Sequence, residues 1–184
     1  MIQFFLPDNT VLNNFAIIGR MDLLETLLRG KGAWCATIAS ECAKGARVPG
    51  REAMSSARHF LGDPWYPETG AERVSVQLIQ DELLGPGDPR TAHLGEAETI
   101  ALVESRGAAA RFITDDKDAR RVAEAHQIGV VTTFDLFRLA LKVRLVTPAE
   151  VYGFAQALHR EQRGVPVSLL GGVTAVEVWA AAAA

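Results

Sequence analysis

The chain has few of the features that mark secreted, membrane or duplex-DNA-binding proteins. Its 184 residues contain two cysteines, Cys35 and Cys42, with no CxxC pair and no nearby set of zinc ligands. Disulfide frameworks and zinc sites are therefore not expected, and we predict that both cysteines are buried small apolar residues. The formal net charge of −3 excludes a broad basic surface for non-specific binding of duplex DNA.

Long apolar segments are also missing. The N-terminal run 2–6 is too short for a signal peptide or a membrane span, and it has no basic flank. We find no internal repeat, and the low-complexity tail 180–184 supports no functional interpretation. We therefore expect a cytoplasmic protein. Its length predicts one domain with a proper hydrophobic core.

Short apolar runs alternate with helical patterns along most of the chain. We predict strands at 2–6, 33–38, 73–79, 110–113 and 129–131, the second of which is alternatively the run into a helix near Ala39. We predict helices at 11–18, 21–28, 39–61 with a break at Pro49-Gly50, 93–104, 119–125, 134–142 and 147–162. This alternation is typical of an α/β fold, with a central parallel sheet flanked by helices.

An acidic turn follows the predicted strand 110–113 and contains Asp115, Asp116 and Asp118. Open α/β sheets place their functional groups beyond the carboxyl ends of the strands. Carboxylates this close together repel one another unless a hard cation such as Mg²⁺ or Mn²⁺ lies between them. From this stretch alone, an acidic loop that caps the next helix is an equally good interpretation.

Acidic residues occur at three further strand or helix ends. Asp8 follows the first predicted strand, Glu41 lies at the head of a helix, and Glu98, with Glu96 beside it, lies in the opening turns of another. The carboxyl ends of parallel strands lie along one edge of a sheet, so we expect these acids to meet Asp116 there.

Each acid also has a structural explanation as a helix cap or a solvated residue, and Asp118 as an ion-pair partner of Arg121. Acidic residues at four strand or helix ends, without a matching cluster of lysine or arginine, nevertheless predict a bound metal ion. Two hard cations held in this way can orient a water molecule and stabilise in-line displacement at a phosphodiester.

Four segments, in this order, resemble the PIN-domain family, as found in VapC-type toxin ribonucleases and related stand-alone prokaryotic PIN proteins. They are 6–12 (LPDNTVL), 40–42 (SEC), 94–102 (LGEAETIAL) and 112–120 (FITDDKDAR). The stretch 129–146 is similar to the closing strand and helix of that family. The resemblance covers residues 2–150 and implies a three-layer fold with a parallel sheet between layers of helices.

The resemblance also implies the residues of a nuclease site. Matched by position, the catalytic acids are Asp8, Glu41, Glu98 and Asp116. A Mg²⁺ or Mn²⁺ site is implied at Asp8, Glu98, Asp116 and Asp118, with Thr10 and Asp115 in supporting roles. The doublet at 115–116 leaves the register of the fourth acid open. The implied activity is metal-dependent endonucleolytic cleavage of RNA by a homodimer, often with an antitoxin that inserts a residue into the site.

The chain departs from a minimal toxin in its longer middle segment, 47–90, and in its extension past Pro148. We predict a PIN-like nuclease domain at 1–150 and a C-terminal helical extension at 151–184 that packs on the same domain. The additions are candidates for a substrate platform, a dimer surface or a partner site.

Aromatic and basic residues offer further possible contacts with nucleic acid. For Trp34, Trp65, Tyr66 and Trp179, a core or interface role is the simpler expectation than base stacking. The basic residues near the acids in sequence can contact phosphate, although a solvated surface role explains them equally; they are Lys44, Arg47, Lys117 and Arg120.

Two other functions remain open from the sequence. Asp8 after a strand is similar to the nucleophile loop of haloacid-dehalogenase-like phosphatases, but Thr10 stands where that family has a second Asp. No lysine lies between Lys44 and Asp115, where that family places one. The second alternative is a non-catalytic PIN-like module that binds RNA or a protein partner.

Overall fold

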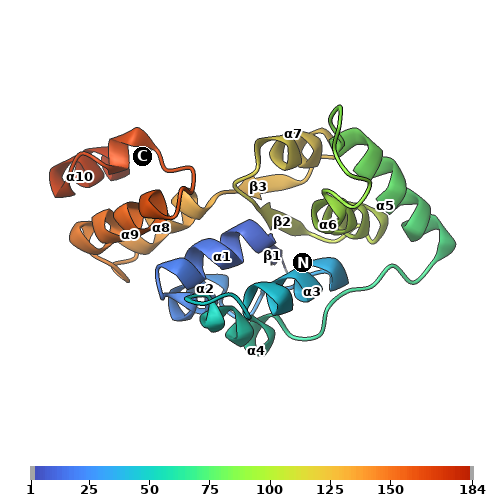
Figure 1. Cartoon of the computed structure of the whole chain (residues 1–184), viewed down its shortest axis with the longest axis horizontal. Coiled ribbons are helices and arrows are strands. Elements are labelled where there is room, and N and C mark those ends of the chain that lie inside the picture. Colours follow the sequence, from blue (N-terminus) through green and yellow to red (C-terminus); the bar gives the residue numbers. More distant parts are fainter. Residues whose placement is uncertain (1–2, 183–184) are drawn as a thin grey trace.

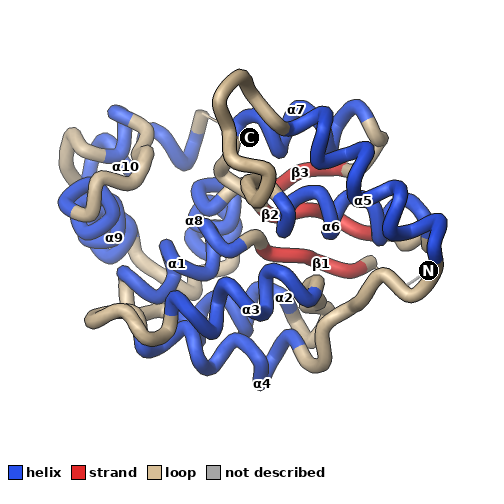
Figure 2. The backbone as a smooth tube through the Cα atoms, turned by 45° about the vertical axis from the view of Figure 1, so that its right-hand side comes forward, coloured by secondary structure: helices blue, strands red, loops and turns tan. Residues whose placement is uncertain are grey.

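Three parallel strands form the centre of the molecule. The computed structural model describes residues 3–182; Ile2 of the first predicted strand and Ala183 and Ala184 of the tail lie outside the described residues. The strands β1 (Phe4–Pro7), β2 (Ala110–Ile113) and β3 (Gly129–Val131) are hydrogen-bonded in the order β1–β2–β3. Figure 2 shows them side by side beneath and between helices. The predicted parallel sheet is confirmed.

Helices cover both faces of this sheet. In chain order they are α1 (Asn9–Ile17), α2 (Met21–Leu28), α3 (Ala36–Gly45), the 3-10 helix η1 (Glu52–Ser56), α4 (Ala57–Leu61), α5 (Gly70–Leu83), α6 (Leu94–Ser105), α7 (Lys117–Ala125), α8 (Thr133–Lys142), α9 (Pro148–Arg160), the 3-10 helix η2 (Val167–Leu169) and α10 (Val173–Ala181). Figure 1 shows α5, α6 and α7 on one side of the strands, α1 to α4 on the other, and α8 to α10 beyond the strand ends. The three-layer α/β fold is therefore confirmed.

Two hydrophobic clusters fill the spaces between these layers. Successive residues of a strand face opposite sides of a sheet. Leu6 and Phe112 accordingly pack with α5, α6 and α7, whereas Ile113 packs in the cluster formed mainly by α1 to α4 and α8 to α10. Val176 and Trp179 of α10 belong to the second cluster, so the C-terminal helices share the core of the N-terminal ones.

The strand predicted at 73–79 is wrong, because these residues belong to α5. A capping box starts this helix, and Val76, Ile79 and Leu83 are buried at helical spacing. Val74 and Leu78 are instead exposed on the outer face of the helix. Their alternation with Val76 produced the false strand pattern in the sequence.

The strand predicted at 33–38 is also wrong, and the alternative, a run into a helix, is correct with the helix starting at Ala36. The residues before it form two isolated bridges, Gly32 with Phe5 and Cys35 with Trp65. A Cβ atom at Gly32 would lie 2.6 Å from the end of the Leu61 side chain, so a larger residue there would require Leu61 to shift. This segment covers the edge of β1 that β2 leaves open.

Apart from the helix predicted at 39–61, which starts three residues early at Ala36, the remaining predicted elements are found with ends shifted by at most two residues. The predicted helix 39–61 is divided at the Pro49-Gly50 break into α3, η1 and α4. Cys35 and Cys42 are free and buried, as predicted. In the described part of the chain, no helix is long and apolar enough to cross a membrane.

Candidate functional site

Asp8 lies at the carboxyl end of β1, where it caps α1. Its carboxylate accepts hydrogen bonds from the backbone of Asn9 at 2.6 Å and from the hydroxyl of Thr10. The side chain is 2% exposed. Burial and the negative charge of Glu96 raise the pKa of Asp8 to about 7, although the bonds from Thr10 and Asn9 act in the opposite direction. The predicted supporting hydroxyl of Thr10 thus contacts the first acid directly.

The turn after β2 separates its two adjacent acids. Asp116 caps α7 by accepting a hydrogen bond from the backbone of Ala119 at 2.8 Å. Asp115 is bound by Asn14 of α1 and by the backbone and hydroxyl of Thr133 at the start of α8. Asp115 therefore joins the strand end to two helices, and Asp116 is the acid of the doublet that is not held in that network.

Close packing of α3 against α6 brings their acids together. A Cβ atom on Gly95 would clash with the Ile38 side chain and would lie 3.6 Å from the Glu41 carboxylate. The glycine therefore lets the first turn of α6, which carries Glu96, approach Glu41 on α3.

Glu96 and Glu98 have different surroundings. The carboxylate of Glu98 is 4% exposed and accepts a hydrogen bond from the backbone of Thr37, at the N-terminus of α3, at 2.9 Å. The carboxylate of Glu96 lies 3.7 Å from a ring nitrogen of His93, and it interacts with the charges of Asp8, Glu41 and Asp116. Residues two apart on a helix point in roughly opposite directions, yet the charge of Glu98 also raises the pKa of Glu41, so both acids of α6 act on the acidic group.

The charges of these acids act on one another. Burial and the charges of Asp8 and Glu98 raise the pKa of Glu41, while Lys44 lowers it. Burial also raises the pKa of Glu96; its own backbone hydrogen bond acts in the opposite direction, and the charges of Asp116 and Glu41 add to the increase. Asp8, Glu41, Glu96 and Asp116 come from four separate elements; we call them the acidic edge. Mutual repulsion of this kind favours a cation among them.

Asp118 lies apart from the acidic edge. Its side chain is 67% exposed and pairs with Arg121, three residues further along α7, at 3.7 Å. This is the structural explanation given above for Asp118, so its predicted place among the metal ligands has no support from its contacts.

Most of the predicted nucleic-acid contacts have other roles. Trp34 is buried and donates a hydrogen bond to the carbonyl of Gly62, and Trp179 is buried beneath Arg138. Trp65 packs edge-on against Phe4, whereas Tyr66 is exposed. Of the basic residues, Lys44, Arg47 and Lys117 are exposed and Arg120 is half-buried, and among residues 3–182 none of the four forms an ion pair.

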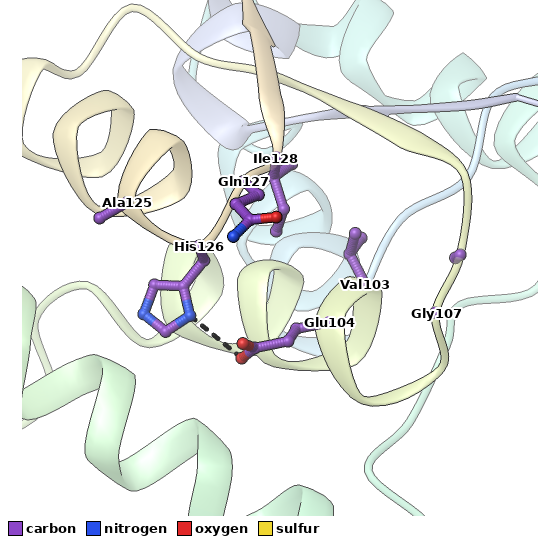
Figure 3. Close-up of a pocket in the computed structure, with 8 residues that line it drawn as sticks. Val103, Glu104, Gly107, Ala125, His126, Gln127 and Ile128 are labelled. Atoms are coloured by element: carbon purple, nitrogen blue, oxygen red, sulfur yellow. Dashed lines mark hydrogen bonds and ion pairs between the residues drawn. The ribbon is translucent and has the colours of Figure 1, made fainter.

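The acidic edge, in which Asp8 is buried and the other three acids are half-buried, is separate from the hollow whose residues Figure 3 shows. A hollow of about 560 Å³, which includes Glu104, His126 and Gln127, lies at the opposite ends of α6 and α7 (Figure 3). Among the described residues, no three acidic, histidine or cysteine side chains are close enough together to hold a metal ion as they stand. The acidic edge therefore consists of carboxylates that interact through their charges over a distance.

Sequence reasoning missed two features of this region. The role of Gly95 becomes visible only in the structure, where α3 packs closely against α6 at this residue. Arg163, in the loop after α9, donates hydrogen bonds to the side chain of Asn14 at 2.8 Å and to the carbonyl of Thr10. No local pattern marks a contact between residues so far apart in sequence.

Comparison with known families agrees with this geometry. A family model described as a PIN domain matches residues 5–170 of the 184. No curated protein and no solved structure matches the chain significantly. The matched region runs from β1 through η2, so it includes the acidic edge and most of the C-terminal extension. The chain belongs to the PIN-domain family, whose fold is nuclease-like.

Proposed function

We propose that this protein is a metal-dependent endoribonuclease that cleaves the phosphodiester backbone of cytoplasmic RNA. The main observation in support is the acidic edge, in which Asp8, Glu41, Glu96 and Asp116 raise one another's pKa or contribute charge to those that are raised. Among residues 3–182, no lysine or arginine forms an ion pair with any of these four carboxylates. His93 lies 3.7 Å from the Glu96 carboxylate and Lys44 lowers the pKa of Glu41, but the net pKa of both acids is raised, and a bound metal ion would relieve this repulsion.

The donors suit a hard divalent cation. All four side chains offer carboxylate oxygens, which Mg²⁺ and Mn²⁺ prefer over nitrogen and sulfur ligands. We assign Asp8, Glu96 and Asp116 as the residues that would hold the cation. Glu96 replaces Glu98 in the ligand set because the Glu98 carboxylate is bound to the N-terminus of α3. When bound, the cation supplies positive charge that stabilises a phosphorane-like transition state.

Side-chain and backbone groups of the protein hold the acids in place and accept the proton of the attacking water molecule. Thr10 and the backbone of Asn9 hold the Asp8 carboxylate in one orientation. Glu41 is half-buried between Asp8 and Lys44, and its raised pKa makes it the best-suited acid to accept a proton from an attacking water molecule. Lys44, Lys117 and Arg120 are the cations that we assign to the phosphate backbone.

A direct test is cleavage of labelled single-stranded and structured RNAs with Mn²⁺, Mg²⁺ or EDTA. We expect metal-dependent cutting by the wild type, and a loss of more than about 100-fold in Asp8→Asn, Glu96→Gln and Asp116→Asn, because each removes a ligand. Glu124→Gln, an exposed acid on α7, is the matched control with the same charge change. Equal activity in Glu96→Gln and the control would contradict the assignment.

The same experiment distinguishes a metal-dependent ribonuclease from a non-catalytic binding module. RNA binding without cutting, in the presence of Mn²⁺ that raises the melting temperature, would assign a binding module. The PIN assignment accounts for the two features on which the phosphatase alternative rests, the strand-end Asp8 and the late acidic pair Asp115-Asp116. A homodimer and an antitoxin partner remain proposals, and sedimentation of the purified chain tests the first of them.

A further inference from the structure

The C-terminal half of α8 and the loop after it expose an apolar band, which consists of Leu139, Val143 and Leu145. Each of these side chains is 41% exposed. Leu139 and Val143 are four residues apart and therefore lie on one face of the chain as it leaves the helix. Exposed apolar groups that are contiguous and bordered by polar residues mark interaction surfaces more often than isolated ones do.

Two hollows flank the apolar band and share Leu139. The larger, of about 930 Å³, lies between α8 and α10 and is lined mainly by apolar atoms, including those of Leu141, Val146 and Ala180. The smaller, of about 220 Å³, lies between α8 and α2 and includes Leu27. The band is thus the ridge of a wider apolar surface formed by three helices.

Unpaired cations border this surface. Arg29, Lys142 and Arg144 line the two hollows, and in the described part of the chain none of the three forms an ion pair. Glu177 is the one acid among the lining residues. Because the whole chain has a net charge of −3, this local excess of positive charge is not a property of the surface in general.

Arg138 also lines the larger hollow but has an internal role. It pairs with Asp135 at 3.7 Å and lies over the ring of Trp179 at 4.1 Å. The cations without an ion pair at this surface are therefore Arg29, Lys142 and Arg144.

We propose that this surface binds an acidic amphipathic helix of another protein. Apolar residues of the helix would cover Leu139, Val143 and Leu145, and carboxylates on its flanks would pair with Arg29, Lys142 and Arg144. The apolar part of the lining is aliphatic, and no aromatic residue lines either hollow, so the surface offers no platform on which nucleic-acid bases stack. This inference does not depend on the proposed nuclease activity.

The structure offers substitutions that remove the cations without harm to the fold. Arg29 and Arg144 have backbone φ angles of 50° and 59°, in the left-handed region that favours glycine. The double variant Arg29→Gly/Arg144→Gly therefore removes two charges and relieves backbone strain. Leu139→Gln/Val143→Gln removes the apolar contacts at positions that are partly exposed, so both variants are expected to fold.

The test is selection from a displayed library of amphipathic helices with a leucine stripe and flanking positions randomised among Glu, Lys, Gln and Ser. We expect wild-type protein to enrich helices with Glu at the flanks. In a direct binding assay, the affinity of the enriched peptides should fall at least about tenfold in each double variant and at high salt. Arg90→Gln, an exposed arginine in the loop before α6, is the control and should leave affinity unchanged.

Three outcomes would overturn the proposal. The first is enrichment of basic or neutral helices, and the second is enrichment that does not differ between wild type and Leu139→Gln/Val143→Gln. The third is self-association of the wild type in sedimentation that the same double variant abolishes, which would make a second copy of the chain the occupant. Circular dichroism melting of every variant verifies that the fold is retained.

Discussion

The carboxylate of Glu98 accepts a hydrogen bond from the backbone N–H of Thr37 at 2.9 Å, so an acid of α6 caps the N-terminus of α3. This bond uses one of the N–H groups that the first turn of a helix leaves without a partner, and the positive end of the helix dipole favours the charge there. The neighbouring acid, Glu96, does not cap α3; it hydrogen-bonds to its own backbone, lies 3.7 Å from His93 and interacts with the charges of Asp116 and Glu41. Two acids of one motif therefore have different contacts, and we propose a structural role for Glu98 and a ligand role for Glu96.

This separation predicts opposite effects for two similar substitutions. Glu98→Gln should lower the free energy of unfolding by about 1–3 kcal/mol, because a buried charge-assisted hydrogen bond is lost. Glu96→Gln should leave stability unchanged or increase it, because one repelling charge is removed. Denaturant unfolding without metal measures both. A greater loss of stability in Glu96→Gln would reverse the assignment.

The same pair should differ in the response to metal. Mn²⁺ is expected to raise the melting temperature of wild type and Glu98→Gln, and to have little effect on Glu96→Gln. This measurement does not need a substrate. It therefore tests the ligand assignment even if the cognate RNA is narrowly defined.

Arg163 connects the loop after α9 to the network behind Asp115. Arg163→Met keeps most of the side-chain volume but removes its hydrogen bonds to Asn14 and Thr10. We expect the free energy of unfolding to fall by about 1–3 kcal/mol, since Asn14 is buried and one of its polar atoms loses a charged partner. Arg160→Met, at an exposed position on α9, is the control, and equal stability of the two variants would argue against the connection.

The ion pair between Glu72 and Arg106 predicts sensitivity to acid. Hydrogen bonds from the backbone of Thr69 and from Arg106 lower the pKa of Glu72 to about 2. A lowered pKa in the folded state adds stability that is complete above the unfolded pKa and is lost as the pH falls towards 2. Glu72→Gln should therefore be less stable than wild type at pH 7, with a difference that shrinks near pH 2.5. Urea titrations across this range test it, with exposed Glu68→Gln as control.

The contacts of His126 predict a pH dependence of stability that is opposite in sign to that of Glu72. Its ring nitrogens face Glu104 at 3.1 Å and Glu82 at 3.3 Å, so it connects α5, α6 and the end of α7; Figure 3 shows the pair with Glu104. Burial lowers the pKa of His126, but the bonds to the two glutamates outweigh it and the net pKa is raised. The stabilisation is then present below the unfolded pKa and is lost as the pH rises through the folded value.

His126→Gln should consequently be less stable than wild type at pH 5.5 and closer to it at pH 9. Chemical denaturation at the two pH values measures this difference, and His159→Gln on α9 is the control for loss of an exposed histidine. A difference that is constant across the range would show that the protonated ring is not what stabilises the fold.

Much of the fold was predictable from sequence because local signals and packing agree. The strands at 110–113 and 129–131 and the break at Pro49-Gly50 are found where apolar runs and helix-breaking residues predict them. The prediction failed at α5, where exposed Val74 and Leu78 produced an alternation that the capping box contradicts. A Thr-x-x-Glu pattern at Thr69 was the signal that favours the helix.

The sequence predicts which strands and helices carry the acids of the candidate site, but not which acid of each pair faces the others. Asp8 and Asp116 lie at strand ends, as the topology requires. The choice between Glu96 and Glu98 depends on the direction in which each side chain leaves α6, and this direction is set by the packing of Gly95 against α3. The choice between Asp115 and Asp116 depends on Asn14 and Thr133, which are distant in sequence. Neither of these two choices can be predicted from local sequence patterns.

The pairing of β1 with β2 has a consequence for folding during synthesis. Phe4 pairs with Ala110 and Pro7 with Ile113, so more than one hundred residues separate the two strands. Closing so long a loop is slow and requires that β2 has left the ribosome. Until then, β1 lacks its strand partner, and Asp8 and Asp116 are not brought together. The acidic edge therefore forms only after the middle segment 47–90 has been made, and an incomplete chain that ends within this segment lacks Glu96 and Asp116.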